Sequence, residues 1–88
     1  MIWSVEFDDA AAKELRRLDQ ETQLRILRYF RERISSCEDP RRFGKALSGD
    51  LGGLWRYRVG NYRMICMIED DTLVVLVLRV GHRKGAYR

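Results

Sequence analysis

An alternating pattern between residues 55 and 63 constrains the fold of this chain more than any other feature. Large apolar residues alternate with arginines on both sides of Gly60–Asn61, in the order Trp-Arg-Tyr-Arg-Val-Gly-Asn-Tyr-Arg. Glycine followed by asparagine favours a two-residue hairpin turn with positive backbone angles, and a turn of that length fixes which residues face each other. The predicted register places Arg58 opposite Arg63.

Three arginines are expected to share one face of this hairpin. Arg56 lies two residues from Arg58, so alternation puts both side chains on the face that also carries Arg63. Like charges that face each other across two strands destabilise a sheet, and neither strand contains an acid. A bound polyanion would relieve this repulsion. The alternative is that loop carboxylates such as Asp50 or Glu38 fold over the face and pair with the arginines.

The remaining elements follow from periodicity and turn residues. Residues 10–34 repeat apolar residues at helical spacing, and Asp19 divides them as the N-cap of a second helix. Residues 35–54 contain one proline and four glycines, which predicts a loop with one short turn over residues 43–47. The strands are expected at residues 2–7, 54–59, 62–68 and 73–80.

Helices early in the chain and hairpins late in the chain indicate an α+β domain. We expect an N-terminal strand, two helices and then a three-stranded antiparallel meander, with both helices packed on one face of the twisted sheet. Eighty-eight residues suffice for one core, so residues 1–88 are assigned to a single domain. The apolar side of the second helix is predicted to contain Leu27, Phe30 and Ile34, flanked by Leu24 and Ile26.

The net charge of +4 is concentrated in the last third of the chain. Residues 1–50 contain ten basic and ten acidic residues, whereas residues 51–88 contain seven and three. The three acids of that segment are consecutive, at residues 69–71, and are assigned to a turn. A local basic surface of this kind favours phosphate-rich partners, although a solvated charged face has the same composition.

Other classes of protein are disfavoured by the sequence. The longest strongly apolar run covers residues 73–78, far short of the roughly 20 residues that span a bilayer. The first residues lack the layout of a signal peptide, so we expect a cytoplasmic protein without a membrane partner. Cys37 and Cys66 are isolated, which favours free thiols over a disulfide or a zinc site. No carboxylate pair suits a metal, so neither a metal nor another cofactor is predicted.

Cationic surfaces next to titratable groups can cleave RNA without a metal. The reaction needs a base for the 2′-OH, donors that stabilise the phosphorane, and an acid for the leaving 5′-oxygen. Arginine stays protonated and supplies only the donors. The tail, residues 81–88, is expected to leave the sheet beside the arginine face, and the proton carrier is therefore sought among His82, Tyr87 and Lys84.

The same residues carry a resemblance to a known family. The stretch from Lys45 to Arg63, with Val80-Gly81-His82-Arg83 and Tyr87, is similar to the signature of RelE-type toxins in the RelE/ParE superfamily. This resemblance implies a toxin that enters the A site of the 70S ribosome and cleaves the messenger RNA there without a metal. It also implies a RelB-like antitoxin partner, encoded beside the toxin, that holds it inactive.

The resemblance assigns roles to individual positions. Arg56 and Arg58 match a basic pair that contacts RNA phosphates, Arg63 matches the arginine at the scissile phosphate, and Arg83 matches a transition-state arginine. Tyr87 matches a tyrosine that stacks on the cleaved nucleotide or assists there. The predicted catalytic set is Arg63, Arg83, His82 and Tyr87, and the predicted RNA-binding set is Arg56, Arg58, Lys45 and Lys84.

One departure from the family pattern affects the mechanism. Some members carry lysines where this chain has Arg56 and Arg58. If one of those lysines is the base, an arginine cannot take its place, because the guanidinium stays protonated. The base would then be His82 or Tyr87. The runner-up function is a ParE-like toxin, which shares the fold, binds DNA gyrase and cleaves nothing. A plain RNA-binding module without toxicity is the third possibility.

Overall fold

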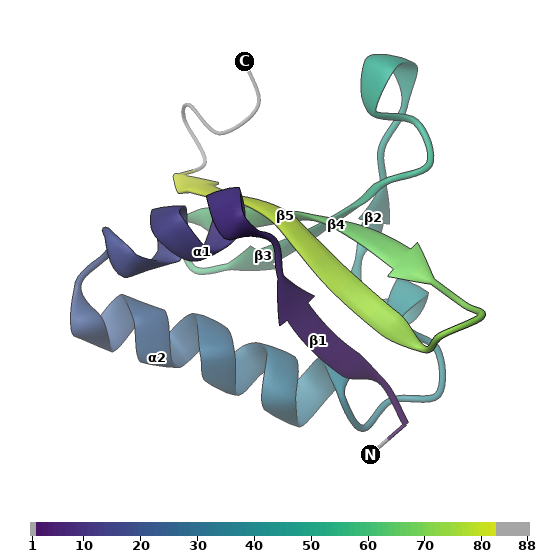
Figure 1. Ribbon diagram of the computed structural model, residues 1–88, viewed down its shortest axis with the longest axis horizontal. Coiled ribbons are helices and arrows are strands. Elements are labelled where there is room, and N and C mark those ends of the chain that lie inside the picture. Colours follow the sequence, from purple (N-terminus) through teal and green to yellow (C-terminus); the bar gives the residue numbers. More distant parts are fainter. Residues whose placement is uncertain (1, 83–88) are drawn as a thin grey trace.

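The predicted hairpin lies in the middle of a five-stranded mixed sheet in the computed structural model, which describes residues 2–82 (Figure 1). β3 (Trp55–Val59) and β4 (Tyr62–Glu69) pair antiparallel with Arg58 opposite Arg63, as the sequence predicts. β4 also pairs antiparallel with β5 (Val74–His82), which completes the meander. The strand order is β1-β5-β4-β3-β2, with β1 at Ser4–Phe7 and β2 at Lys45–Ala46.

The turn of the β3–β4 hairpin depends on Gly60. Its φ is +58°, whereas Asn61 does not have the positive φ that the sequence analysis assigned to it. A glycine with positive φ at the first central position and a second residue without one match the II′ type of hairpin turn. A Cβ on Gly60 would also lie 3.2 Å from the guanidinium of Arg25. The backbone angle therefore favours glycine, and a side chain at this position would also displace the flexible end of Arg25.

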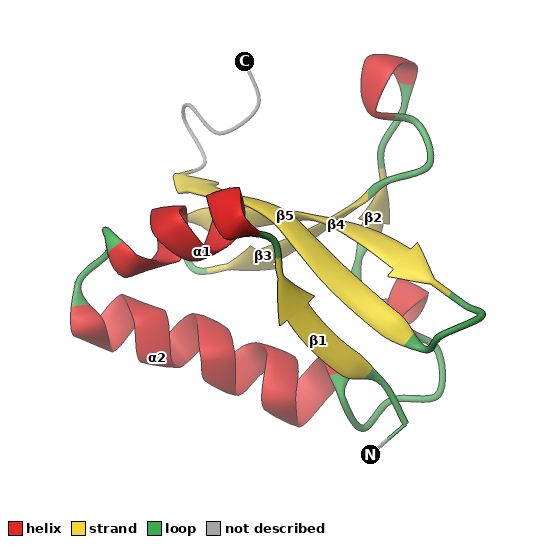
Figure 2. Cartoon of the chain, in the orientation of Figure 1, coloured by secondary structure: helices red, strands yellow, loops and turns green. Residues whose placement is uncertain are grey.

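Two helices cover one face of the sheet, and no helix of residues 2–82 covers the other face (Figure 2). They are α1 (Asp9–Arg16) and α2 (Gln20–Tyr29), and α2 continues into one π turn over Phe30–Ile34. The side chain of Asp19 accepts a hydrogen bond from the Thr22 amide at 3.1 Å, which confirms the predicted N-cap. The α+β class and the packing of both helices on one face are confirmed.

The buried side of α2 differs by one position from the prediction. Ile26 is fully buried and stacks one turn before Phe30, which lies in the core. Leu27, one helical step around the axis, is 40% exposed, and Leu24 is 51% exposed. The core faces Ile26 because residues four apart lie on the same side of a helix. The prediction had placed Leu27 in the core and Ile26 at its edge, so two leucines remain on the surface.

The segment between α2 and β3 has more structure than a loop. It contains 3-10 turns at Pro40–Phe43 and Gly49–Leu51 with β2 between them, so the predicted turn over residues 43–47 was placed too late. The buried Tyr57 hydroxyl donates a hydrogen bond to the Pro40 carbonyl at 2.7 Å. Arg41 contacts Asp70 at 2.6 Å, and its guanidinium lies 5.9 Å from the Trp55 ring. These contacts hold the segment against the sheet.

The two cysteines are free thiols, as predicted. Cys66 belongs to the single core cluster that both helices and the sheet build, and its burial raises the pKa of its thiol. Cys37 lies outside that cluster and packs against it. Within residues 2–82, no helix is long and apolar enough to cross a membrane.

Candidate nucleic-acid interface

Four cations lie on the face of the sheet that the helices leave uncovered. In β3 and β4, Tyr57 and Met64 face each other and are fully buried beneath the helices. Because side chains alternate, the residues between them point to the opposite face. β2 adds a cation to that face, since its residue 45 pairs with residue 56 of β3. We call this set the basic face: Lys45, Arg56, Arg58 and Arg63.

The basic face has no acidic partner among the described residues. The ion pairs within residues 2–82 join Arg41 to Asp39 and Asp70, and Arg79 to Glu14. Neither Asp50 nor Glu38 pairs with the arginines of β3 and β4, so the alternative of loop carboxylates folded over the face is not seen. The positive charge of this face is therefore available to an anion.

Arg58 and Arg63 form the closest pair of cations on the basic face. They are one step from the pair that flanks the two-residue turn, so they occupy a non-hydrogen-bonded position, where facing Cα atoms are only about 4.5 Å apart. The Nε atom of Arg63 is buried and has no hydrogen-bond partner among the described residues. This pair can supply N–H donors to one phosphate from two strands.

A β-bulge determines which part of β5 borders the basic face. Ile65 pairs with Arg79 and the next residue, Cys66, pairs with Val77, so Leu78 is the extra residue of β5. Gly81 then lies opposite Arg63. This register places Arg79 and Gly81 on the same face of the sheet as Ile65 and Arg63.

Arg79 is a cation of this region that the sequence analysis did not single out. Its Nε donates to Glu14 at 3.1 Å, and the second oxygen of that carboxylate accepts from the Val80 amide at 2.7 Å. Burial acts to raise the pKa of the Glu14 carboxyl, but these hydrogen bonds and the charges of Arg79 and Arg17 together lower it. No local sequence signal pairs residues so far apart, because the contact joins α1 to β5.

His82 does not point to the basic face. It pairs with Tyr62, and the two rings meet edge to face at 5.4 Å between centroids. Alternation along β5 puts His82 on the side of the buried Val80, the side that the helices cover. This corrects the expectation that the histidine joins the arginines, although its catalytic role remains a prediction. Arg83, Lys84 and Tyr87 lie outside the described residues, and their roles also remain predictions.

Acidic side chains gather elsewhere. Glu69, Asp70, Asp71 and Thr72 line a hollow of about 460 Å³ at the turn between β4 and β5, at the opposite end of β4 from Arg63. The carboxyl of Asp70 has a lowered pKa because Arg41 donates to it. Residues 2–82 contain no group of three or more His, Cys, Asp or Glu side chains that could hold a metal ion. The hollow is thus separate from the basic face.

The fold and this face define a small α+β domain with a basic sheet surface that has no acidic partner among the described residues. Residues 5–87 match the family described as ParE toxin of type II toxin-antitoxin system, parDE. The chain is 32% identical over 88 residues to Toxin RelG of Mycobacterium tuberculosis (strain ATCC 25618 / H37Rv). The aligned region covers 100% of this chain and 99% of Toxin RelG. The chain therefore belongs to the RelE/ParE family of toxins from type II toxin–antitoxin systems.

Solved structures support the same assignment. A chain of the toxin–antitoxin complex RelBE2 from Mycobacterium tuberculosis is similar to this structure with a TM-score of 0.85 and 30% identity, over 94% of this chain and 100% of that one. A chain of the archaeal RelE–RelB complex from Pyrococcus horikoshii OT3 matches with a TM-score of 0.73 and 29% identity, over 98% and 100% of the two chains. The resemblance drawn from residues 45–63 and the C-terminal tail is confirmed.

Proposed function

We propose that this toxin is a ribosome-dependent endoribonuclease that cleaves messenger RNA in the A site and thereby inhibits translation. The observation that carries the proposal is the basic face, where four cations from three strands lie together without an acidic partner among the described residues. The relationship to proteins named RelG and RelE supports it. A phosphodiester in the transition state would bind this face more strongly than in the ground state, because its negative charge increases there.

The proposed reaction uses the RNA's own 2′-OH as the nucleophile. A base removes the proton from the 2′-OH, the 2′-oxygen attacks the phosphorus, and the bond from phosphorus to the 5′-oxygen breaks. An acid protonates the leaving 5′-oxygen, so the products are a 2′,3′-cyclic phosphate and a 5′-hydroxyl. Arg63 and Arg83 stabilise the phosphorane, and Arg56, Arg58, Lys45 and Lys84 bind flanking phosphates. His82, Tyr87 and Lys84 are the candidate proton carriers, and no metal takes part.

The proposal includes partners and a location. The two structural relatives described above are chains of toxin–antitoxin complexes, which supports a RelB-like antitoxin that binds this chain and neutralises it. The ribosome and its messenger are the targets, and the whole chain acts as one domain in the cytoplasm.

A second candidate function is a ParE-like toxin that binds DNA gyrase without cleaving nucleic acid. It is retained because the matching family is described by the parDE system. The basic face favours the nuclease, since gyrase binding does not require donors for a scissile phosphate. Both candidates predict growth arrest, so only a biochemical assay separates them.

Toeprinting of a translated messenger with the purified full-length chain tests the proposal. We expect new 5′ ends within the A-site codon, carrying a 5′-hydroxyl on the downstream fragment, and no cutting when the nucleotide 5′ of the scissile phosphate is 2′-deoxy. Chelation of transition metals should leave the cutting unchanged. Arg42→Gln, which removes an exposed arginine outside the sheet, is the control for lost charge. An intact messenger together with inhibited DNA supercoiling by gyrase would exclude the proposed nuclease activity and support the ParE-like function instead.

A further inference from the structure

The end of β5 extends past the strand that pairs with it at the edge of the sheet. β1 pairs in parallel with β5 as far as Phe7 and Val77, and the Asp8 amide donates to the Val77 carbonyl at 2.9 Å. The chain then leaves the sheet and enters α1, whereas β5 continues to His82. The backbone of β5 beyond Val77 therefore needs another hydrogen-bond partner on this side.

Glu14 of α1 supplies that partner. One oxygen of its carboxylate accepts from the Val80 amide at 2.7 Å, and the other oxygen accepts from Nε of Arg79 at 3.1 Å. The carboxylate thus takes the place that a backbone carbonyl of a neighbouring strand would occupy. A hydrogen bond from a backbone N–H to a carboxylate is stronger than one to a neutral carbonyl, so this contact can hold the strand by itself.

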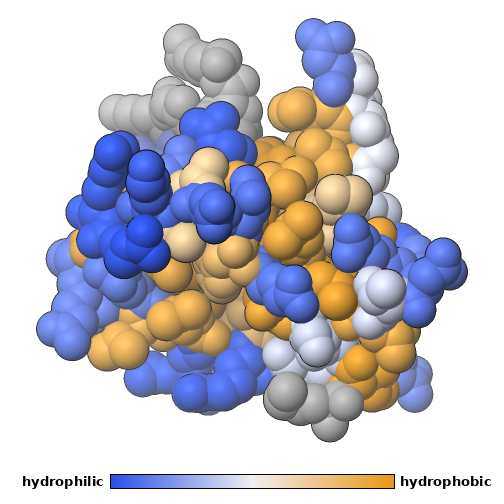
Figure 3. Space-filling view, viewed as in Figure 1, coloured by the Kyte–Doolittle hydropathy of each residue, from blue (hydrophilic) through white to orange (hydrophobic). Residues whose placement is uncertain are grey.

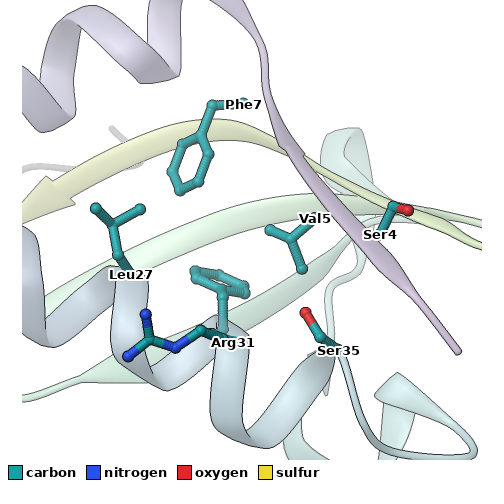
Figure 4. Close-up of a pocket in the computed structure, with 7 residues that line it drawn as sticks. Ser4, Val5, Phe7, Leu27, Arg31 and Ser35 are labelled. Carbon is teal, nitrogen blue, oxygen red and sulfur yellow. The ribbon is translucent and has the colours of Figure 1, made fainter. Parts of the chain in front are cut away.

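The position of Glu14 is fixed by the packing of α1 around it. Ala11 and Leu15 are buried on the same side of the helix. Hydrophilic side chains gather over α1 (Figure 3), but the Glu14 side chain is only 23% exposed. Just before α1, Phe7 points from the end of β1 towards α2 (Figure 4), and its ring meets that of Phe30 edge to face at 6.0 Å between centroids. Both the start and the body of α1 are therefore anchored in the core.

The contact lies close to the basic face. Gly81 follows Val80 directly and lies opposite Arg63 in the β4–β5 register. Arg63 is the residue whose buried Nε has no hydrogen-bond partner among the described residues. His82 ends β5, and Arg83, to which the proposed reaction gives the second phosphorane contact, is the next residue in the sequence. A shift of Val80 would therefore move the chain that the proposed reaction uses relative to Arg63.

We propose that Glu14 is a positioning residue for RNA cleavage, because its contact with Val80 fixes the end of β5 relative to Arg63. This inference rests on the proposed function for the reaction that Glu14 affects. Glu14 does not transfer a proton itself, since hydrogen-bond donors occupy both oxygens of its carboxylate. Burial acts to raise its pKa, but these hydrogen bonds and the charges of Arg79 and Arg17 hold the pKa below its usual value. The carboxylate is therefore ionised at neutral pH.

Single-turnover cleavage of a messenger on programmed ribosomes by the full-length chain tests the proposal. Glu14→Ala should lower the maximal rate by about 10- to 100-fold, since a misplacement of about 1 Å costs on the order of 10²-fold. The ribosome concentration that gives half of the maximal rate should change little. Glu14→Asp should also lower the rate, because its shorter side chain keeps the charge but does not reach the Val80 amide. Glu14→Gln retains an acceptor for this amide and should cut faster than Glu14→Ala by about tenfold.

Asp19→Ala is the matched control, because it also removes an acid and destabilises the fold through the N-cap of α2. It should leave the cleavage rate unchanged. NMR gives a readout that does not depend on cleavage, since His82 is the only histidine of the chain and its ring lies 5.4 Å from that of Tyr62. Glu14→Ala should shift the His82 ring signals and speed the exchange of the Val80 amide by about tenfold or more. Asp19→Ala should leave the His82 signals in place.

The possible failures of this inference are distinct. Wild-type rates in Glu14→Ala and Glu14→Asp would overturn it, and so would a lowered rate with unmoved His82 signals, because the effect would then not pass through β5. The pH profile of the rate should keep its shape in each variant, and a flattened profile would make Glu14 a proton carrier instead. If the wild-type chain cuts no messenger, the proposed function fails together with this role, whereas wild-type cutting with unaffected variants removes this role alone.

Discussion

Arg58→Gln should stabilise the fold while it weakens RNA cleavage. Arg58 faces Arg63 at a non-hydrogen-bonded position with no acid paired to either, and like charges so placed destabilise a sheet by roughly 0.2 to 1 kcal/mol. Removing one of them should raise the free energy of unfolding by about that amount. For a domain of this size the melting temperature should rise by about 1 to 8 °C.

Thermal unfolding followed by circular dichroism measures this effect. The stabilisation should be largest at low ionic strength and should shrink as salt rises, since the Debye length falls to about 8 Å at 0.15 M. Arg42→Gln removes the same charge from an exposed position outside the sheet and should change the melting temperature less. A lower melting temperature for Arg58→Gln, or a rise in melting temperature that salt does not reduce, would refute the reasoning. The arginines of the basic face would then not repel each other enough to favour a bound anion.

Three further outcomes are expected. Arg63→Ala should lower the single-turnover cleavage rate by about 10² to 10³ without unfolding the chain, because its Nε has no described partner to lose; wild-type cleavage would contradict its role. Glu14→Gln should cost about 1 kcal/mol in denaturant unfolding. Since the folded pKa of Glu14 is lowered, this difference should persist above about pH 4.5 and vanish as the pH falls through the folded pKa; a pH-independent difference would exclude the ion pair. Tyr57→Phe should cost about 1 to 3 kcal/mol because it leaves the Pro40 carbonyl without its donor, and equal stability would show that water replaces the hydroxyl.

The sequence predicted what local patterns determine. The β3–β4 register and the cap at Asp19 depend on neighbouring residues, and both are confirmed. Contacts between distant segments were not predictable: the parallel pairing of β1 with β5, the two-residue strand β2 that brings Lys45 beside Arg56, and the contact of Glu14 with Arg79. The side of α2 that faces the core was predicted wrongly, because Ile26 and Leu27 are similarly apolar. Which of the two is buried depends on where the sheet lies relative to the helix.

The bulge at Leu78 links the core to the basic face. Before it, Val75 and Val77 are buried at a spacing of two; after it, the next buried residue is Val80, at a spacing of three. Without the extra residue, continued alternation would place Arg79 in the core and Val80 on the basic face. β1 makes its last hydrogen bond to β5 at Val77, and the Glu14 carboxylate accepts the Val80 amide beyond that point. With this register Gly81, which has no side chain, lies opposite Arg63 on the basic face.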